Sequence, residues 1–315
     1  MNKNIKIYIA GHRGLVGSAI KREFEKKGYT NLVYRTHSEL DLKDSKAVAK
    51  FFEKEKPEYV VLSAAKVGGI YGNNTYPVEF FTENMKIQLN VIENSYKSGV
   101  KKLLFLGSSC IYPKNAPQPM KEEYLLSDYL EKTNEMYALA KIAGLKLCAS
   151  YNREYGTNYM CVMPCNLYGI GDNYHPQNAH VIPMLIRRFH EAKVNNLPET
   201  TVWGTGTPRR EFLFADDLAE AVVFLMENKD AKDIGEFINI GSGFDMPISE
   251  IVELIKETVG YKGKLIYDNT KPDGTMLKLM DVSKINALGW KAKTNIKDGL
   301  KVSYHDFLNN EGRSK

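Results

Sequence analysis

The sequence predicts an α/β fold, a doubly wound parallel sheet with a smaller, interleaved C-terminal lobe. Three observations support this prediction. Short, wholly apolar runs typical of strands alternate with helical stretches in the first half, a glycine-rich turn follows the first apolar run, and Pro, Gly and Asn become frequent after about residue 165. Strands that alternate with helices form βαβ units, and wholly apolar strands fit a sheet that is covered on both faces.

The expected elements follow this alternation in order. Strands are predicted at residues 6–10, 31–34, 59–62, 102–106 and 160–163. Helices are predicted between them at residues 15–27, 45–54, 79–98 and 134–154, and beyond them at residues 181–193, 217–228 and 249–259. Residues 1–165 are therefore expected to form one domain, to which some later segments return. Residues 166–315 are expected to form mainly a second lobe, with a ligand-binding crevice between the two.

Composition places the 315-residue chain among ordinary globular proteins, because 43% of its residues are hydrophobic and 26% are charged. These values exclude a disordered, fibrous or disulfide-scaffold protein. The apolar runs are shorter than the roughly 18 to 20 residues that cross a bilayer. Met1-Asn2-Lys3-Asn4 leads directly into a strand pattern rather than into a secretory signal. A cytoplasmic protein without a membrane partner is expected.

Charge and cysteine usage exclude two further classes of partner. The formal net charge of +5 is modest, and no basic cluster or interleaved aromatic stripe indicates nucleic acid. The cysteines show no C-x-x-C spacing and no paired metal-ligand pattern; they are Cys110, Cys148, Cys161 and Cys165. We expect reduced thiols and no metal site.

A glycine-rich turn, Gly11-His12-Arg13-Gly14-Leu15-Val16-Gly17, lies between the first predicted strand and the first predicted helix. Three glycines at this spacing allow a tight turn, the close approach of a pyrophosphate, and close packing of helix on strand. The helix N-terminus then offers N–H groups to the phosphates. The turn predicts a Rossmann-type dinucleotide site; a tight turn without a ligand is the alternative.

The end of the second strand favours NADP(H) over NAD(H). An NAD site normally carries an acid there that binds the ribose 2′-OH, whereas this chain has Tyr34-Arg35-Thr36-His37. Arg13 and Arg35 are able to form charge-assisted hydrogen bonds with a 2′-phosphate. Asp41 and Leu42 are expected beside the adenine, although Asp41 equally fits a cap for the helix that begins at residue 45.

A tyrosine and a lysine in one predicted helix supply a candidate acid–base pair. Tyr137 and Lys141 lie one turn apart on the same face, and a nearby ammonium lowers the pKa of a phenol. Ser108 follows the fourth apolar strand, at the edge of the sheet where open α/β folds gather catalytic groups. A surface Tyr/Lys pair without function is the alternative.

The chain resembles the extended short-chain dehydrogenase/reductase superfamily and, within it, the GDP-L-fucose synthase family of 3,5-epimerase/4-reductases. The glycine turn, the strand-end serine and the Tyr-x-x-x-Lys pair occur in the order of the superfamily. The family resemblance covers nearly the whole chain and is carried by residues 10–14, 65–70, 73–77, 105–113, 150–152, 166–169, 180–183, 187–190, 203–204, 210–212, 271–275 and 288–290.

The resemblance implies residue roles in a reaction on GDP-4-keto-6-deoxy-D-mannose. Cys110 corresponds to the base and His180 to the acid of epimerisation, with Ser108 and Tyr137 around O4. Tyr137 then supplies the proton for hydride reduction at C4, and Lys141 supports it. The alternatives are a core thiol at Cys110 and a helix cap at His180.

The resemblance also implies ligand contacts outside this catalytic set. Asn166, Leu167, His180 and His37 join the predicted NADP(H) contacts. Contacts with the nucleotide sugar are expected at Arg188, Trp203, Arg210 and Asp273, with Trp203 alternatively a core residue. A homodimer packed through the helices at residues 79–98 and 134–154 is also implied.

Several positions depart from the family pattern. Met276-Leu277 stands where Pro-Arg is expected, His37 where a basic residue is frequent, Cys165 where threonine is common and Ala179 where serine is common. These departures leave open a related GDP-4-keto-6-deoxy-heptose as substrate. A non-catalytic NADP(H)-sensing protein is the alternative from another class, but the chain retains both Tyr137 and Lys141.

Overall fold

The computed structural model describes residues 1–176, 179–271 and 273–309. Its centre is a six-stranded parallel sheet in the order β2-β1-β3-β4-β5-β9. The central strands are wholly or almost wholly buried, as their apolar sequences predict. The six strands are β1 (Ile7–Ala10), β2 (Leu32–Val33), β3 (Tyr59–Leu62), β4 (Lys102–Leu106), β5 (Tyr159–Pro164) and β9 (Ile238–Ile240).

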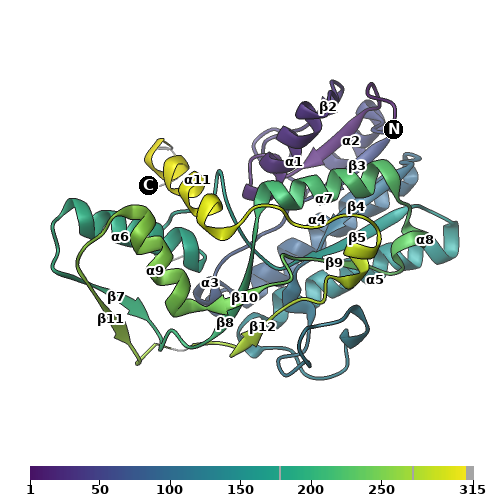
Figure 1. Ribbon diagram of the computed structural model, residues 1–315. Helices are drawn as coiled ribbons and strands as arrows, with labels where there is room; N and C mark the ends of the chain where they lie inside the picture. The colour runs from purple at the N-terminus through teal and green to yellow at the C-terminus, as the bar shows by residue number, and fades with distance from the viewer. Residues whose placement is uncertain (177–178, 272, 310–315) are drawn as a thin grey trace.

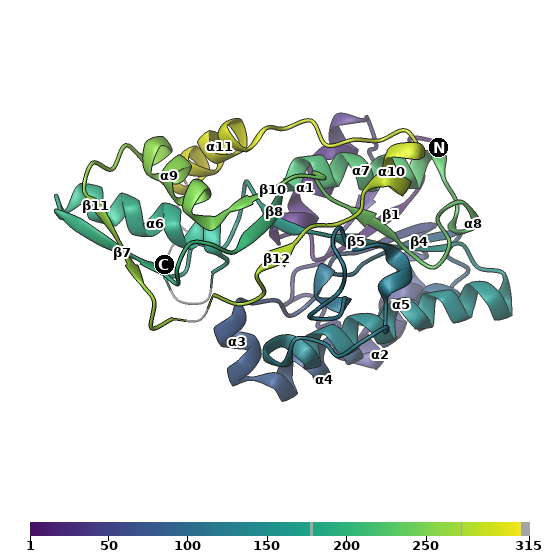
Figure 2. The same cartoon turned by 60° about the horizontal axis from the view of Figure 1, so that its bottom comes forward.

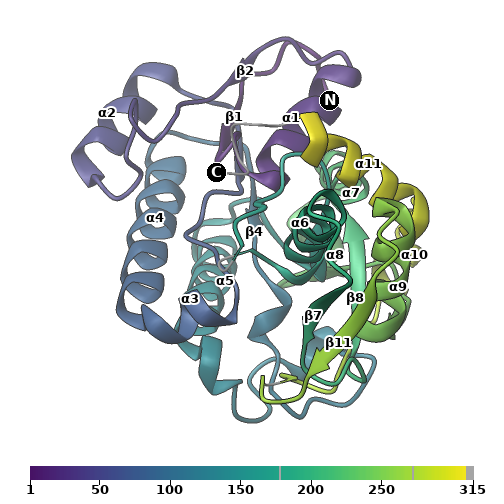
Figure 3. The same ribbon diagram turned by 90° about the vertical axis from the view of Figure 1, so that its left-hand side faces the viewer.

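Helices cover both faces of this sheet (Figure 3). One face carries α1 (Leu15–Lys26) and α7 (Ala215–Asn228), which pack against each other. The other carries α2 (Ser45–Glu55), α4 (Pro77–Lys97) and α5 (Glu135–Tyr155). The predicted α/β class with a doubly wound parallel sheet is therefore confirmed, with helix ends that differ from the predicted ones by one or two residues.

The α2 N-terminus corrects one expectation about Asp41. Asp44 is the N-cap, since its carboxylate accepts hydrogen bonds from the backbone N–H groups of Lys46 and Ala47 at 2.9 and 3.1 Å. Asp41 instead accepts from the backbone N–H of Lys43 at 2.9 Å. The cap alternative for Asp41 is therefore wrong.

The lobe lies beside the carboxyl ends of the sheet strands (Figures 1 and 2). Its centre is β8 (Arg209–Phe214), which pairs with β10 (Asp245–Pro247), β12 (Leu277–Lys278) and β6 (Asn166–Tyr168). A second core packs α6 (Val181–Val194), α9 (Ile248–Val259) and α11 (Ile296–Asn309) together. The remaining strands and α-helices of the described residues are β7 (Glu199–Trp203), β11 (Lys264–Asp268), α3 (Ile70–Thr75), α8 (Ala231–Ile234) and α10 (Ser283–Ala287).

The chain crosses between the sheet and the lobe more than once. β9 and α7 follow the first lobe segments in sequence, yet β9 pairs with β5 and α7 packs on α1. The lobe is thus anchored to the sheet at several points. Within the described residues, no helix has both the length and the apolarity needed to cross a membrane.

Candidate active site

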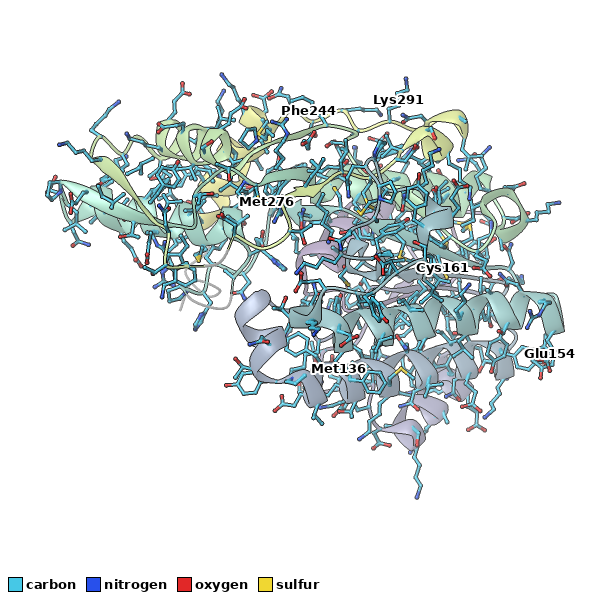
Figure 4. All side chains as sticks on the ribbon, turned by 90° about the horizontal axis from the view of Figure 1, so that it is seen from below. Met136, Glu154, Cys161, Phe244, Met276 and Lys291 are labelled. Carbon is cyan, nitrogen blue, oxygen red and sulfur yellow. The ribbon has the colours of Figure 1, made fainter. Side chains whose placement is uncertain are left out.

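One cavity of about 1280 Å³ runs along the carboxyl ends of the parallel strands and extends to the lobe. The sheet side is lined by the turns after β1, β3, β4 and β5, and the lobe side by residues of α6, β8 and β12. Figure 4 labels one residue from each side of the molecule. Met136, at the start of α5, lies in the lower part of the view, and Met276, just before β12, lies in the lobe in the upper part. This is the crevice in which open α/β sheets bind ligands.

The glycine turn has the shape that a dinucleotide pyrophosphate requires. Gly11 has φ +87°, and a Cβ there would lie 2.8 Å from the backbone N and Cα of Ala64. A Cβ on Gly17 would collide with the Gly11 carbonyl. Gly14 is the N-cap of α1 and has no side chain to cover the helix N-terminus. The residues present therefore fit a phosphate group held on backbone N–H groups.

Most of the residues predicted to contact the adenine and its ribose line this same cavity. Arg35 lines it, with its guanidinium paired to Glu55 at 2.6 Å, and so do His37, Asp41 and Leu42. Arg13 does not line this cavity. It lies at a smaller neighbouring cavity of about 450 Å³ together with Lys21.

The Tyr137–Lys141 pair faces the cavity from α5, but its electrostatics differ from the expectation. Lys141 donates a hydrogen bond to the Leu106 carbonyl at 2.8 Å, and its Nζ lies 5.8 Å from the centre of the Tyr137 ring. Burial raises the pKa of Tyr137 well above its ordinary value, and the hydrogen bond with Ser108 offsets part of the rise. The pKa of Tyr137 is thus raised rather than lowered as the Tyr–Lys spacing predicted, because desolvation of the buried phenol is the largest cause of its shift.

Lys141 itself responds to the same environment. Its side chain is only 3% exposed, and burial lowers its pKa to about 8. The ammonium is held by the Leu106 carbonyl at the end of β4, and it remains mainly protonated at neutral pH. This geometry suits a group that orients a neighbour and a ligand rather than one that ionises Tyr137.

A short 3-10 helix, Ser109–Ile111, follows β4. Ser108 is its N-cap residue, and Cys110 is its central residue. The Ser108 hydroxyl accepts a hydrogen bond from the Cys110 N–H at 3.4 Å. Cys110 is 7% exposed, and burial raises the pKa of its thiol, while the ammonium groups of Lys278 and Lys141 offset part of the rise. Both residues line the cavity.

His180 reaches the cavity from the lobe side, immediately before α6. It is the N-cap residue of α6 by backbone position, but its side chain makes no capping hydrogen bond. The imidazole is exposed to the cavity yet enclosed by protein, and this burial lowers its pKa. The structure thus brings His180, Cys110, Ser108, Tyr137 and Lys141 to one cavity, from a strand end, a helix and a helix start.

The predicted nucleotide-sugar contacts divide into two groups. Arg210 and Asp273 line the cavity. Arg188 and Trp203 lie outside its lining, with the Arg188 guanidinium 5.2 Å above the Trp203 ring. Trp203 is 42% exposed, so the core alternative for Trp203 is wrong.

Two more predicted contacts come from the strand after β5. Asn166 and Leu167 line the cavity. The Asn166 amide donates a hydrogen bond to the Glu211 carbonyl at 2.9 Å, which fixes its position. Pro272, inside the segment at residues 271–275 that carries the family resemblance, lies outside the described residues.

The sequence prediction missed one functional candidate, Lys278 on β12. Its side chain lines the cavity directly beside Arg210, because Lys278 pairs with Arg210 in the β12–β8 register. The ammonium makes no ion pair with any residue that the structure describes. The available signal was a lysine in an otherwise apolar run, Leu277-Lys278-Leu279-Met280.

Comparison with known proteins identifies the chain. Residues 7–241 match the NAD dependent epimerase/dehydratase family. GDP-L-fucose synthase 1 of Arabidopsis thaliana is 57% identical over 309 residues, which are 98% of this chain and 95% of that protein. GDP-L-fucose synthase of Escherichia coli is 52% identical, with 98% of each chain covered. The chain belongs to the GDP-L-fucose synthase family. The predicted family is thereby confirmed.

The fold of this family member also matches a solved relative. A GDP-mannoheptose C4 reductase from Campylobacter jejuni, solved with NADP bound, is 42% identical. It superposes with a TM-score of 0.89 and covers 98% of this chain and 99% of that one. A member of the GDP-L-fucose synthase family thus shares its architecture with a reductase of a GDP-heptose.

Proposed function

We propose that the protein is an NADPH-dependent 3,5-epimerase/4-reductase that converts GDP-4-keto-6-deoxy-D-mannose to GDP-L-fucose. The observation that carries the proposal is one cavity lined by Cys110, His180, Tyr137, Ser108 and Lys141. The chain that carries these five residues is 52–57% identical to proteins named GDP-L-fucose synthase. The set contains both an acid–base pair and a group able to protonate a reduced ketone.

NADP(H) fits the sheet side of the cavity. The turn of Gly11, Gly14, Leu15, Val16 and Gly17 would hold the pyrophosphate on its N–H groups. At the adenine end, Arg35 and His37 would face the 2′-phosphate, with Asp41 and Leu42 along the base; Arg13 would approach from the adjoining cavity. When bound, NADPH supplies the hydride that reduces C4.

Epimerisation uses the acidity that a C4 ketone gives to the protons on C3 and C5. We assign Cys110 as the base that removes each proton and His180 as the acid that returns one on the opposite face of the ring. The hydroxyls of Ser108 and Tyr137 would stabilise the negative charge that develops on O4 by hydrogen bonding. Cys110 and His180 come from the sheet and lobe sides of the cavity, as opposite faces require.

Reduction needs a proton at O4 as the hydride arrives at C4. Because burial raises the pKa of Tyr137, the phenol is protonated at neutral pH and able to donate. Lys141, fixed by the Leu106 carbonyl, would orient Tyr137 and bind the nicotinamide ribose. The high phenol pKa therefore suits an acid in the reductive direction.

The diphosphate of the substrate would lie against Arg210 and Lys278. Two cations that face one cavity repel each other, and an anion between them removes the repulsion. Asp273 is held by the Thr205 backbone N–H and hydroxyl at 2.7 and 2.8 Å. Arg188 and Trp203 would extend the site beyond the cavity, toward the nucleoside.

The proposed assembly is a homodimer in the cytoplasm, formed through α4 and α5. Leu89, Tyr96 and Tyr155 are 42%, 40% and 50% exposed on these helices, and the rings of Tyr96 and Tyr155 stack at 4.6 Å. Such apolar surface favours contact with a second copy. Light scattering at micromolar concentration should show a dimer, and Leu89→Glu should weaken it; a monomer for the unaltered chain would contradict the assembly.

The function is tested with purified protein, GDP-4-keto-6-deoxy-D-mannose and NADPH. We expect NADPH oxidation and a product whose NMR spectrum is that of GDP-L-fucose. Tyr137→Phe serves as the matched control, since it removes one hydroxyl. No NADPH oxidation with the unaltered protein would reject the enzyme and leave an NADP(H)-sensing protein.

A related GDP-4-keto-6-deoxy-heptose is the second candidate substrate, favoured by the 42% identity to the heptose reductase. Parallel assays with the hexose and the heptose decide between them. A higher kcat/KM for the hexose supports the proposal, and a clear preference for the heptose replaces it.

A further inference from the structure

A buried carboxylate stands directly behind the lobe wall of the cavity. Glu211 lies on β8 between Arg210 and Phe212, both of which line the cavity. Because side chains alternate along a strand, Glu211 points to the opposite side, where it is 0% exposed. Glu211 does not line the cavity, and the proposed chemistry does not use its carboxylate.

This carboxylate fastens two backbone segments to β8. One oxygen accepts hydrogen bonds from the Gly243 N–H at 2.7 Å and the Ser242 hydroxyl at 3.4 Å. The other oxygen accepts from the Met280 N–H at 2.9 Å. Met280 lies two residues beyond Lys278, so Glu211 holds the strand that carries the unpaired lysine.

The loop after β9 is built around the same group. A Cβ on Gly241 would collide with the Glu211 carboxylate, so only glycine leaves room for it. Burial raises the pKa of Glu211 to about 6, and the donated hydrogen bonds offset part of the rise. A carboxylate accepts at both oxygens. An amide in its place has one accepting oxygen and turns an NH₂ group toward one of these donors.

The hydrogen bond from the Met280 N–H to Glu211 helps to fix the register of β12 on β8. β12 has two residues, and its pairing places Lys278 opposite Arg210. A slip of one residue turns every side chain of a strand to the other face, which here would remove the Lys278 ammonium from the cavity. Met120 and Gln118 hold Leu279 from the other side, through hydrogen bonds at its carbonyl and N–H of 2.8 Å each.

We propose that Glu211 is a positioning residue for the binding of the GDP-sugar diphosphate. By accepting the Met280 N–H, it keeps β12 in register with β8, so that Lys278 and Arg210 face the cavity side by side. The inference rests on the proposed function, since it takes the anion between the two cations to be the substrate diphosphate.

The test is a double-mutant cycle on the binding of GDP to the NADP-loaded protein, measured by calorimetry. The variants are Glu211→Gln, Lys278→Met and the double variant, with Glu250→Gln on the exposed start of α9 as the matched control. We expect Glu211→Gln to weaken GDP binding about tenfold, which corresponds to about 1.4 kcal/mol, because the loss of this hydrogen bond frees the backbone of β12 that holds Lys278 at the cavity. The double variant should bind GDP no more weakly than Lys278→Met alone, and the NADP affinity should stay within about twofold.

The outcomes separate the two proposals. GDP binding by Glu211→Gln equal to that of the unaltered protein overturns the positioning role, and so do losses that multiply in the double variant. If Glu211→Gln fails to fold by circular dichroism, Glu211→Asp takes its place in the same cycle, since it keeps the charge but shortens the reach. No GDP binding by the unaltered protein would instead reject the proposed function.

Discussion

The two ends of the cavity are built in different ways. The end proposed for the cofactor is made chiefly by backbone, since a Cβ on Gly11 or Gly17 would collide with neighbouring backbone atoms in the turn. The end proposed for the sugar is made by side chains that come from several separate elements, among them Cys110, His180, Arg210 and Lys278. A site formed by the backbone of one turn is determined by a short stretch of sequence. A site formed by side chains from several elements depends on how the fold brings distant segments together. Substitutions should therefore affect the two ends independently.

The largest expected effect separates catalysis at the sugar end from binding at the cofactor end. Cys110→Ala removes the proposed base, and the exchange of the C3 proton should fall by about 10²–10⁴-fold. NADPH affinity, measured by fluorescence titration, should be unchanged. Equal losses in both measurements would mean that Cys110 acts through the fold rather than as the base.

A second substitution targets the cofactor end. Gly17→Ala places a methyl group against the Gly11 carbonyl. Overpacking of this kind should lower the free energy of unfolding by about 3 kcal/mol and weaken NADPH binding. Gly14→Ala is the control for the free energy of unfolding alone, because its Cβ would lie 3.4 Å from the nearest atom, an ordinary contact. Indistinguishable denaturation curves for the two variants would contradict the tight-turn account.

The pH dependence of proton exchange tests the sugar end. Burial raises the pKa of Cys110 above its ordinary value and lowers that of His180. Exchange requires a thiolate and an imidazolium together, so its rate should rise with pH up to the His180 pKa. It should then stay level and fall again above the Cys110 pKa. Proton-exchange rates measured by NMR from below the His180 pKa to above the Cys110 pKa check this pH profile.

The Lys278→Met variant should shift the pH profile of proton exchange in a defined way. In the unaltered protein the Lys278 ammonium favours the Cys110 thiolate, so its removal should raise the pKa of Cys110 further. The falling limb should move to higher pH, and the level region should drop by the same factor. An unchanged alkaline limb would contradict the assigned influence of Lys278 on Cys110.

The smallest expected effect concerns cofactor choice. Arg35→Leu removes a cation from the adenine end and should reduce the preference for NADPH over NADH about tenfold, roughly 1.4 kcal/mol. Lys50→Gln on the exposed side of α2 is the control and should leave the ratio of kcat/KM values unchanged. A ratio unaffected by Arg35→Leu would remove Arg35 from the 2′-phosphate site.

The fold was largely predictable, because the central strands are apolar and buried on both faces. β9 (Ile238–Ile240) was not predicted, because a strand of three residues shows too little hydrophobic pattern in the sequence. β2 is limited to Leu32–Val33, shorter than its apolar run suggested. Local pattern thus fixes long central strands, and tertiary pairing decides the short ones.

The candidate site divides in the same way. The glycine turn and the Tyr137–Lys141 spacing are local, and both were found in the sequence. The sign of the Tyr137 pKa shift was wrong because burial, not spacing, determines it. Lys278 was missed, and the position of Arg13 at the adjoining cavity rather than in the main one was not foreseen, since both depend on which elements become neighbours.

The central claim is that Cys110 and His180 exchange protons at the carbons beside a ketone before any reduction. It is tested most directly by incubating the protein with GDP-4-keto-6-deoxy-D-mannose in D₂O without NADPH and recording NMR spectra. We predict deuterium at both C3 and C5 with the unaltered protein, and loss of exchange at both carbons in Cys110→Ala. A substrate that keeps both protons, although the protein oxidises NADPH with the same substrate, would show a simple 4-reductase and contradict the account.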